Sequence, residues 1–186
     1  MRIQTVYRPI IAINQTAAKN AVIVVLASVV LALISQIALH LWWPVPITLQ
    51  SAMVVLLGLS LGSKRASAAV ALYLLEGALG LPVFAGGLSG FAYLLGSSAG
   101  YLWGFLPAAF VAGFLMEKGF AKNYISIFAA GLIATTVIFF CGFSHLTVLI
   151  GFHNAYVFGV KPFLLVEPIK LMVATLVAKS AWQKAS

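Results

Sequence analysis

Charged residues are scarce in this 186-residue sequence: they make up 8% of it, and only three of them are acidic. Hydrophobic residues make up 63%, and the mean hydropathy is +1.10. A compact soluble domain needs more polar side chains than this to cover its surface. The composition therefore excludes a soluble globular protein and indicates an integral membrane protein embedded in the lipid bilayer.

The sequence also lacks the residues of several kinds of site. Its one cysteine, Cys141, excludes a disulfide framework and a cysteine-based metal site, and its three histidines are widely scattered. We therefore expect no bound metal and no cofactor. Residues 58–64 lack the spacing of a phosphate-binding loop, so the chain is not expected to use ATP by itself. Residues 87–90, GLSG, match the G-x-S-G form of rhomboid-type proteases, but no predicted span carries a central histidine as base, so we predict no enzyme.

The sequence contains long apolar runs, which predict membrane-spanning helices. Ala21–Leu41 and Tyr124–Phe143 have the length of about 20 residues at which a helix crosses the hydrocarbon, whereas a membrane β-barrel shows alternating segments of roughly 10. We predict an all-α membrane protein, with a single integral membrane domain over residues 1–186. Its six transmembrane helices are expected at about residues 20–41, 48–61, 66–79, 99–116, 124–143 and 162–182. Small residues four apart, such as Ala109 and Gly113, predict close packing between these helices.

The net charge of +8 is explained by the distribution of the basic residues, without a nucleic-acid partner. Six spans place both termini on one side, and nine of the eleven Lys and Arg residues fall on that side. Only Lys161 lies opposite, with Lys170 inside the membrane. By the positive-inside rule, both termini are expected in the cytoplasm, with the protein in the bacterial cytoplasmic membrane.

Glu167 and Lys170 are the sharpest signal of a site. An ionisable residue within a span costs a few kcal/mol and usually faces a cavity or a partner, and a spacing of three places both side chains on one helix face. Pro168 suits the first position of a helix, which would make Glu167 its N-cap. The pair suits the N–H and C=O groups of a small neutral ring, although an internal salt bridge is the alternative. Glu76 is a secondary candidate that either lines the same cavity or lies at the lipid interface.

The segment Gly80–Tyr101 holds six glycines and four aromatic residues between the third and fourth predicted spans. Irregular backbone at membrane depth is tolerated where it lines a cavity or is buried in protein. Glycine also permits positive φ and a close approach to a ligand. We therefore predict that this Gly-rich segment faces outward and covers a small-molecule pocket, with Phe84 among the aromatic residues that line it.

Four stretches of the chain resemble the BioY family, the biotin-specific S components of energy-coupling-factor (ECF) vitamin transporters. They are VPITLQ at residues 45–50, GLPVFAGG at 80–87, GSSAGY at 96–101 and the segment from Lys161 through Glu167 to Lys170. The resemblance covers about residues 20–180. It implies a six-helix S-component fold that captures biotin from the outer face and delivers it inward with a transmembrane T subunit and ATPase subunits.

The resemblance also implies which residues meet biotin. Glu167 and Lys170 fall where the family places an Asp and a Lys against the ureido ring, so the carboxylate here has one more methylene. By the resemblance, Gln50, Tyr101 and the loop from Ala85 to Leu88, with Gly86 and Gly87, line the pocket. Thr48, Phe84 and Glu76 complete the predicted substrate-binding residues. Two alternatives stay open: an S component for another vitamin or a biotin precursor, and a membrane-embedded enzyme or ion or proton pathway.

Overall fold

The structure is a computed structural model that describes residues 16–39, 44–120 and 123–185. It is a bundle of helices with one short antiparallel strand pair, β1 (Ala38–Leu39) and β2 (Ile47–Thr48). The helices are α1 (Ala17–Ser35), α2 (Gln50–Leu61), α3 (Ser63–Ala78), α4 (Ala99–Leu115), α5 (Tyr124–Ile150), α6 (Phe152–Gly159) and α7 (Phe163–Ala185). Short helical turns η1 (Ala85–Gly87) and η2 (Phe91–Leu95) lie in the Gly-rich segment, and η3 (Met116–Phe120) ends α4.

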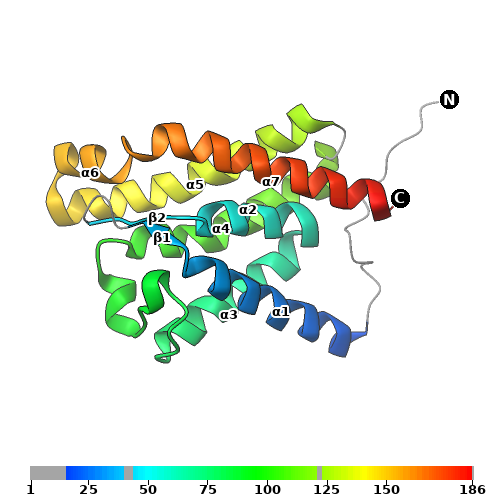
Figure 1. The fold of residues 1–186 in the computed structure, drawn as a ribbon, viewed down its shortest axis with the longest axis horizontal. Coiled ribbons are helices and arrows are strands. Elements are labelled where there is room, and N and C mark those ends of the chain that lie inside the picture. Colours follow the sequence, from blue (N-terminus) through cyan, green and yellow to red (C-terminus); the bar gives the residue numbers. More distant parts are fainter. Residues whose placement is uncertain (1–15, 40–43, 121–122, 186) are drawn as a thin grey trace.

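Six of these helices correspond to the six predicted spans. Among the described residues, α1, α4 with η3, and α5 are long and apolar enough to cross a membrane, and α2 is a shorter apolar helix. Helices α2 and α3, with 12 and 16 residues, are short as predicted. Figure 1 shows α6 and the Gly-rich segment at the end of the bundle opposite the start of α1 and the end of α7.

The largest differences from the predicted helix ends are at the ends of α5 and α1. Helix α5 continues to Ile150 instead of ending at Phe143, and the connection after it contains the additional short helix α6. The polar residues of this stretch fit a helix that leaves the hydrocarbon, where Gly151, with φ of 80°, separates the two helices. Helix α1 ends at Ser35, short of the predicted residue 41, and residues 40–43 lie outside the described chain, as do Arg2, Arg8 and Lys122.

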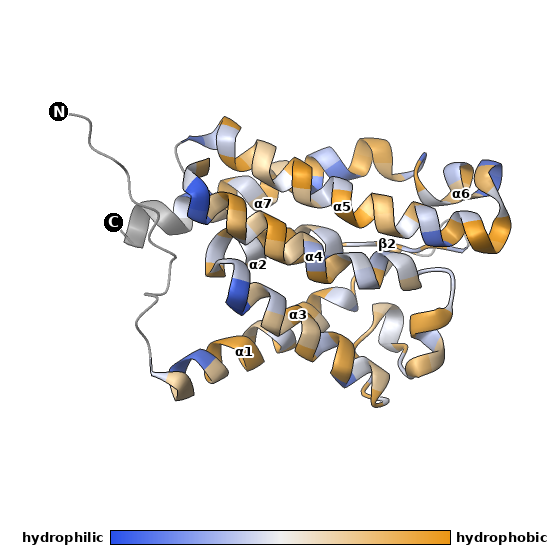
Figure 2. Ribbon diagram, turned by 180° about the vertical axis from the view of Figure 1, so that it is seen from behind, coloured by the Kyte–Doolittle hydropathy of each residue, from blue (hydrophilic) through white to orange (hydrophobic). Residues whose placement is uncertain are grey.

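Charged residues are concentrated at one end of the bundle, as their sequence positions predict. Figure 2 shows hydrophilic residues gathered where α1 and α3 begin and where α4 ends. There, the Glu117 carboxylate accepts hydrogen bonds from the Ser63 backbone N–H at 2.8 Å and from the Ser63 hydroxyl at 3.0 Å. A carboxylate satisfies the free N–H groups at a helix N-terminus, so Glu117 caps α3 from a different helix.

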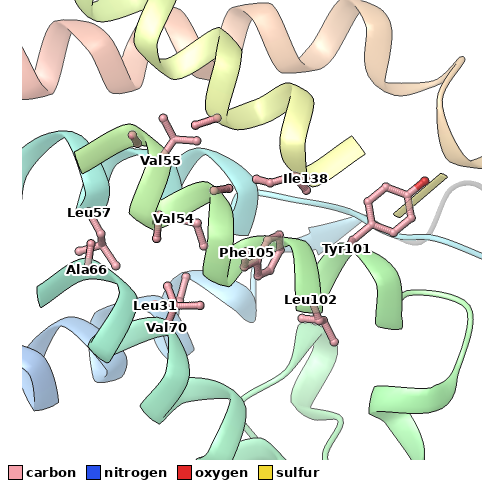
Figure 3. Packing of buried hydrophobic residues seen from close by; sticks show 14 of the residues in the cluster. Leu31, Val54, Val55, Leu57, Ala66, Val70, Tyr101, Leu102, Phe105 and Ile138 are labelled. Carbon is pink, nitrogen blue, oxygen red and sulfur yellow. The ribbon is translucent and has the colours of Figure 1, made fainter. Parts of the chain in front are cut away.

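The core is apolar and takes side chains from α1 to α7. Figure 3 shows Leu31, Val54, Val70, Phe105 and Ile138 converging from α1 to α5, with Tyr101 at the edge of the cluster. Small residues bring the helices close, as the spacing of Ala109 and Gly113 predicts, since both are buried against neighbouring helices.

Replacing Gly113 with alanine is expected to lower the free energy of unfolding by about 1–3 kcal/mol, the usual cost of overpacking. A Cβ atom on Gly113 would lie 2.2 Å from the Ser63 backbone nitrogen, and backbone cannot move aside as a flexible side chain can. Gly96→Ala is the matched control, because its Cβ would meet nothing closer than 3.4 Å. Thermal unfolding of the purified protein in detergent measures both, and equal stabilities for the two variants would contradict this packing.

Candidate functional site

The site is built around the ion pair between Glu167 and Lys170, which lie one turn apart on the inward face of α7. Both residues are buried, with exposed fractions of 7% and 8%. Two charges removed from water need close partners to offset their desolvation. The surroundings of the pair therefore decide what it can do.

The start of α7 differs from the sequence prediction. The helix begins at Phe163, directly after Pro162, so Glu167 lies inside it and is not an N-cap. Pro168 is also inside the helix, where it has no N–H to donate to the Leu164 carbonyl four residues earlier. It is tolerated because it lies close to the N-terminus, where few helical hydrogen bonds are lost.

The start of α2 supplies polar partners for both charges. The Ser51 hydroxyl lies 3.0 Å from each oxygen of the Glu167 carboxylate, and the Lys170 ammonium donates to the Ser51 hydroxyl at 2.9 Å. Lys170 also donates to the Thr48 carbonyl at 2.7 Å. The end of β2 and the first turn of α2 are thus joined to α7, although about 120 residues separate them in sequence.

Gln50, the residue before Ser51, makes a second set of polar contacts. The Gln50 amide donates to the Tyr73 hydroxyl at 2.5 Å, and its oxygen accepts from the Thr48 hydroxyl at 3.1 Å. Tyr73 is fully buried on α3. The hydrogen bonds therefore hold the Gln50 side chain between β2 and α3, beside the ion pair.

Aromatic rings form the opposite side of the site. Tyr101 of α4 and Phe163 of α7 are stacked with ring centres 6.4 Å apart, and Phe139 of α5 meets Phe163 edge-on at 5.5 Å. The Tyr101 hydroxyl donates to the Gly159 carbonyl at 2.7 Å. Its hydroxyl is engaged within the protein, so Tyr101 offers the site mainly a flat apolar ring.

These groups surround a small pocket of about 40 Å³. Thr48, Gln50, Ser51 and Glu167 provide its polar lining, and Tyr93 and Ser98 extend it into the Gly-rich segment. Burial raises the pKa of the Tyr93 phenol, so this group stays neutral at physiological pH. A neighbouring apolar groove of about 240 Å³ between α5 and α7 shares Phe139, Phe163 and Glu167 with the pocket.

The structure brings together some of the predicted binding residues and separates others. Thr48, Gln50, Tyr101 and Glu167 line the pocket, and Lys170 lies behind Glu167 and Ser51 without lining the pocket or the groove. Phe84, Gly86, Gly87, Leu88 and Glu76 do not line the pocket. Their assignment to ligand binding stays a prediction, as does that of the residues within the pocket.

The separated residues have other surroundings. Phe84 is fully buried, with its ring stacked on Tyr93 at 5.2 Å and edge-on to Tyr73 at 5.6 Å. Gly86 and Gly87 take positive φ in η1, and the following residue Leu88 is exposed. Glu76 accepts a hydrogen bond from the Ser28 hydroxyl of α1 at 3.1 Å. Only the later part of the Gly-rich segment therefore reaches the pocket.

Sequence reasoning missed several residues of the site, above all Ser51, Tyr73, Phe139 and Phe163. Ser51 follows Gln50 directly, but a single serine in an apolar helix gives no signal of its own, because serine is common in membrane helices. Tyr73 and the two phenylalanines resemble ordinary core residues in a sequence that is 12% aromatic. Their roles depend on contacts between distant helices.

Comparison with known proteins agrees with this architecture. A model of the BioY family matches residues 8–186. The chain is 38% identical to a probable biotin transporter BioY of Pyrococcus horikoshii over 73% of its length and 80% of the relative's. It is 40% identical to the biotin transporter BioY of Thermotoga maritima over 73% and 79% of the two chains. A crystal structure of the S-component for biotin from an ECF-type ABC transporter has the same fold, with a TM-score of 0.79 and 23% identity over 91% of this chain and 95% of the other.

Proposed function

We infer that this chain, which belongs to the BioY family, binds biotin as the S component of an ECF-type uptake transporter. The observation that carries this proposal is the buried Glu167 carboxylate in the wall of a pocket that aromatic rings also line, among them those of Tyr101 and Phe163. Such a wall suits a neutral ring that has N–H groups on one edge and apolar faces. The ureido ring of biotin has two N–H groups beside one carbonyl and is fused to an apolar thioether ring.

The pocket must widen to hold such a ring system, because a volume of about 40 Å³ holds only a few water molecules. Phe139 and Phe163 line both this pocket and the 240 Å³ groove between α5 and α7. We expect rotation of either ring to join the two spaces, with Glu167 in the wall of both. Side-chain rotations of this kind are common when a ligand binds.

The position of the pocket fits capture from outside the cell. It lies where β2, α2, α4 and α7 meet the Gly-rich segment, at the end of the bundle away from the basic residues at the start of α3. With both termini in the cytoplasm, this end faces outward. A transmembrane T subunit and ATPase subunits would then drive release of biotin to the cytoplasm, because the sequence has no phosphate-binding loop of its own.

Two measurements on the purified protein test the proposal. In calorimetry, we expect saturable binding of biotin. In a competition assay with labelled biotin, we expect that unlabelled thiamine and riboflavin do not displace the label. Absence of saturable biotin binding would refute the proposal, and displacement by another vitamin would redirect it to an S component of different specificity. Co-purification of T and ATPase subunits from native membranes tests the transport partners separately.

A further inference from the structure

Tyr73 of α3 lies at the centre of a chain of buried hydrogen bonds that leads away from the pocket. Its side chain is fully buried, and its hydroxyl accepts a hydrogen bond from the Gln50 amide at 2.5 Å. The same hydroxyl is also hydrogen-bonded to the side chain of Ser35, the fully buried last residue of α1. Of these three residues, only Gln50 lines the pocket.

The Ser35 hydroxyl decides the direction of these hydrogen bonds. Its single proton is directed at two backbone carbonyls, that of Ala32 at 2.6 Å and that of Val83 in the Gly-rich segment. Ser35 can therefore only accept a hydrogen bond from Tyr73, and the Tyr73 proton is used in that bond. The Tyr73 oxygen then acts as an acceptor, so it must face the nitrogen of the Gln50 amide.

This chain of hydrogen bonds holds the Gln50 amide in one of its two orientations. An amide group can turn over about its last bond, which exchanges its donor and its acceptor. Here the nitrogen faces Tyr73, and the oxygen accepts from the Thr48 hydroxyl at 3.1 Å. The amide has a second N–H and a second lone pair. Because Gln50 lines the pocket, the orientation of its amide determines where a ligand meets a donor and where it meets an acceptor.

We propose that Tyr73 is a positioning residue for ligand binding, which orients the Gln50 amide and, through Ser35, ties it to the end of α1 and to the Gly-rich segment. Tyr73 does not line the pocket, so it acts on the ligand only through Gln50. A phenylalanine in its place keeps the ring that packs edge-on against Phe84 but removes the acceptor. A buried N–H without a partner is costly, so the amide then turns or moves. This role rests on the proposed function, in which the ligand is biotin.

Biotin affinities of four proteins test this role by calorimetry: wild type, Tyr73→Phe, Gln50→Leu and the variant with both substitutions. We expect Tyr73→Phe alone to weaken binding about 5-fold, as for the loss of one hydrogen bond. In the Gln50→Leu background, the same substitution should change the affinity less than about 2-fold, because the residue through which Tyr73 acts is gone. Tyr156→Phe removes a hydroxyl from an exposed tyrosine of α6, and as the matched control it should bind like wild type.

Ser35→Ala tests the same chain without altering Tyr73 or the pocket wall, and it serves even if Tyr73→Phe is too unstable to purify. The substitution removes the acceptor of the Tyr73 proton, so Tyr73 can donate to Gln50 and the amide can turn over. We expect about 3-fold weaker biotin binding. Ser28→Ala on the same helix is the control, because Ser28 donates to Glu76 and does not line the pocket, and it should change the affinity less than about 1.5-fold.

Thermal unfolding of the unliganded proteins separates positioning from a merely structural role. If Tyr73 only stabilises the fold, Tyr73→Phe lowers the stability, and its effect on affinity is the same in the presence and absence of Gln50. That result, or wild-type affinity in both Tyr73→Phe and Ser35→Ala, would overturn the inference and leave biotin binding intact. Wild-type protein that binds no biotin would overturn the proposed function, and the role of Tyr73 with it.

Discussion

Glu167→Gln is expected to weaken biotin binding by about 30-fold or more, which corresponds to at least about 2 kcal/mol. The substitution keeps the shape of the side chain but removes the charge that accepts from Ser51 and Lys170. It also leaves the Lys170 ammonium buried beside a neutral amide, and a buried charge without an opposite charge is strongly destabilising. Isothermal titration of the purified variant with biotin measures the change.

Two companion variants make this result specific. Glu76→Gln removes a carboxylate outside the pocket. We expect less than about a 3-fold change in biotin affinity, because Glu76 accepts a hydrogen bond from Ser28 on α1 and does not line the pocket. The double variant Glu167→Gln with Lys170→Met removes both buried charges, so it should recover thermal stability lost by the single variant without recovering binding. Equal loss of affinity in Glu76→Gln and Glu167→Gln would contradict the location of the site.

Most of the helices could be predicted because long apolar runs and their breakers are local signals. Gly62, with φ of 84°, separates α2 from α3, between the spans predicted at about residues 48–61 and 66–79. The end of α5 and helix α6 could not be predicted in this way. Polar residues after Phe143 mark the end of the hydrocarbon, but they do not decide whether the chain unwinds there or continues as a helix.

Charge inside the membrane also gives a local signal, so Glu167 and Lys170 stand out from the sequence alone. The spacing of three predicts that both side chains lie on one helix face, and the ion pair between them confirms it. The sequence does not indicate that Ser51 bonds to both, nor that Lys170 lies behind the pocket wall. Those facts depend on how α2 packs against α7, which is a property of the whole bundle.

The Gly-rich segment shows how one sequence feature can combine two roles. Glycine indicates backbone with positive φ, and this conformation is found at Gly80, Gly86, Gly87 and Gly90. That signal alone does not say which part of the segment faces a ligand. Tyr93 and Ser98 reach the pocket, whereas Phe84 is buried between rings of the protein itself. Its aromatic side chain therefore serves to hold the segment in place.

Phe84→Ala is accordingly expected to destabilise the protein by about 3–5 kcal/mol, the usual cost of removing a fully buried phenylalanine. The ring packs against Gly77 and stacks on Tyr93, so its loss leaves a cavity beneath the segment and frees a residue of the pocket wall. Phe91→Ala is the matched control in the same segment, because Phe91 is 61% exposed, and its effect should stay below about 0.5 kcal/mol. Thermal unfolding with and without biotin distinguishes the two roles of Phe84. An anchor loses stability in the absence of ligand, whereas a residue that only lines the pocket would lower affinity and leave the unliganded protein as stable as wild type.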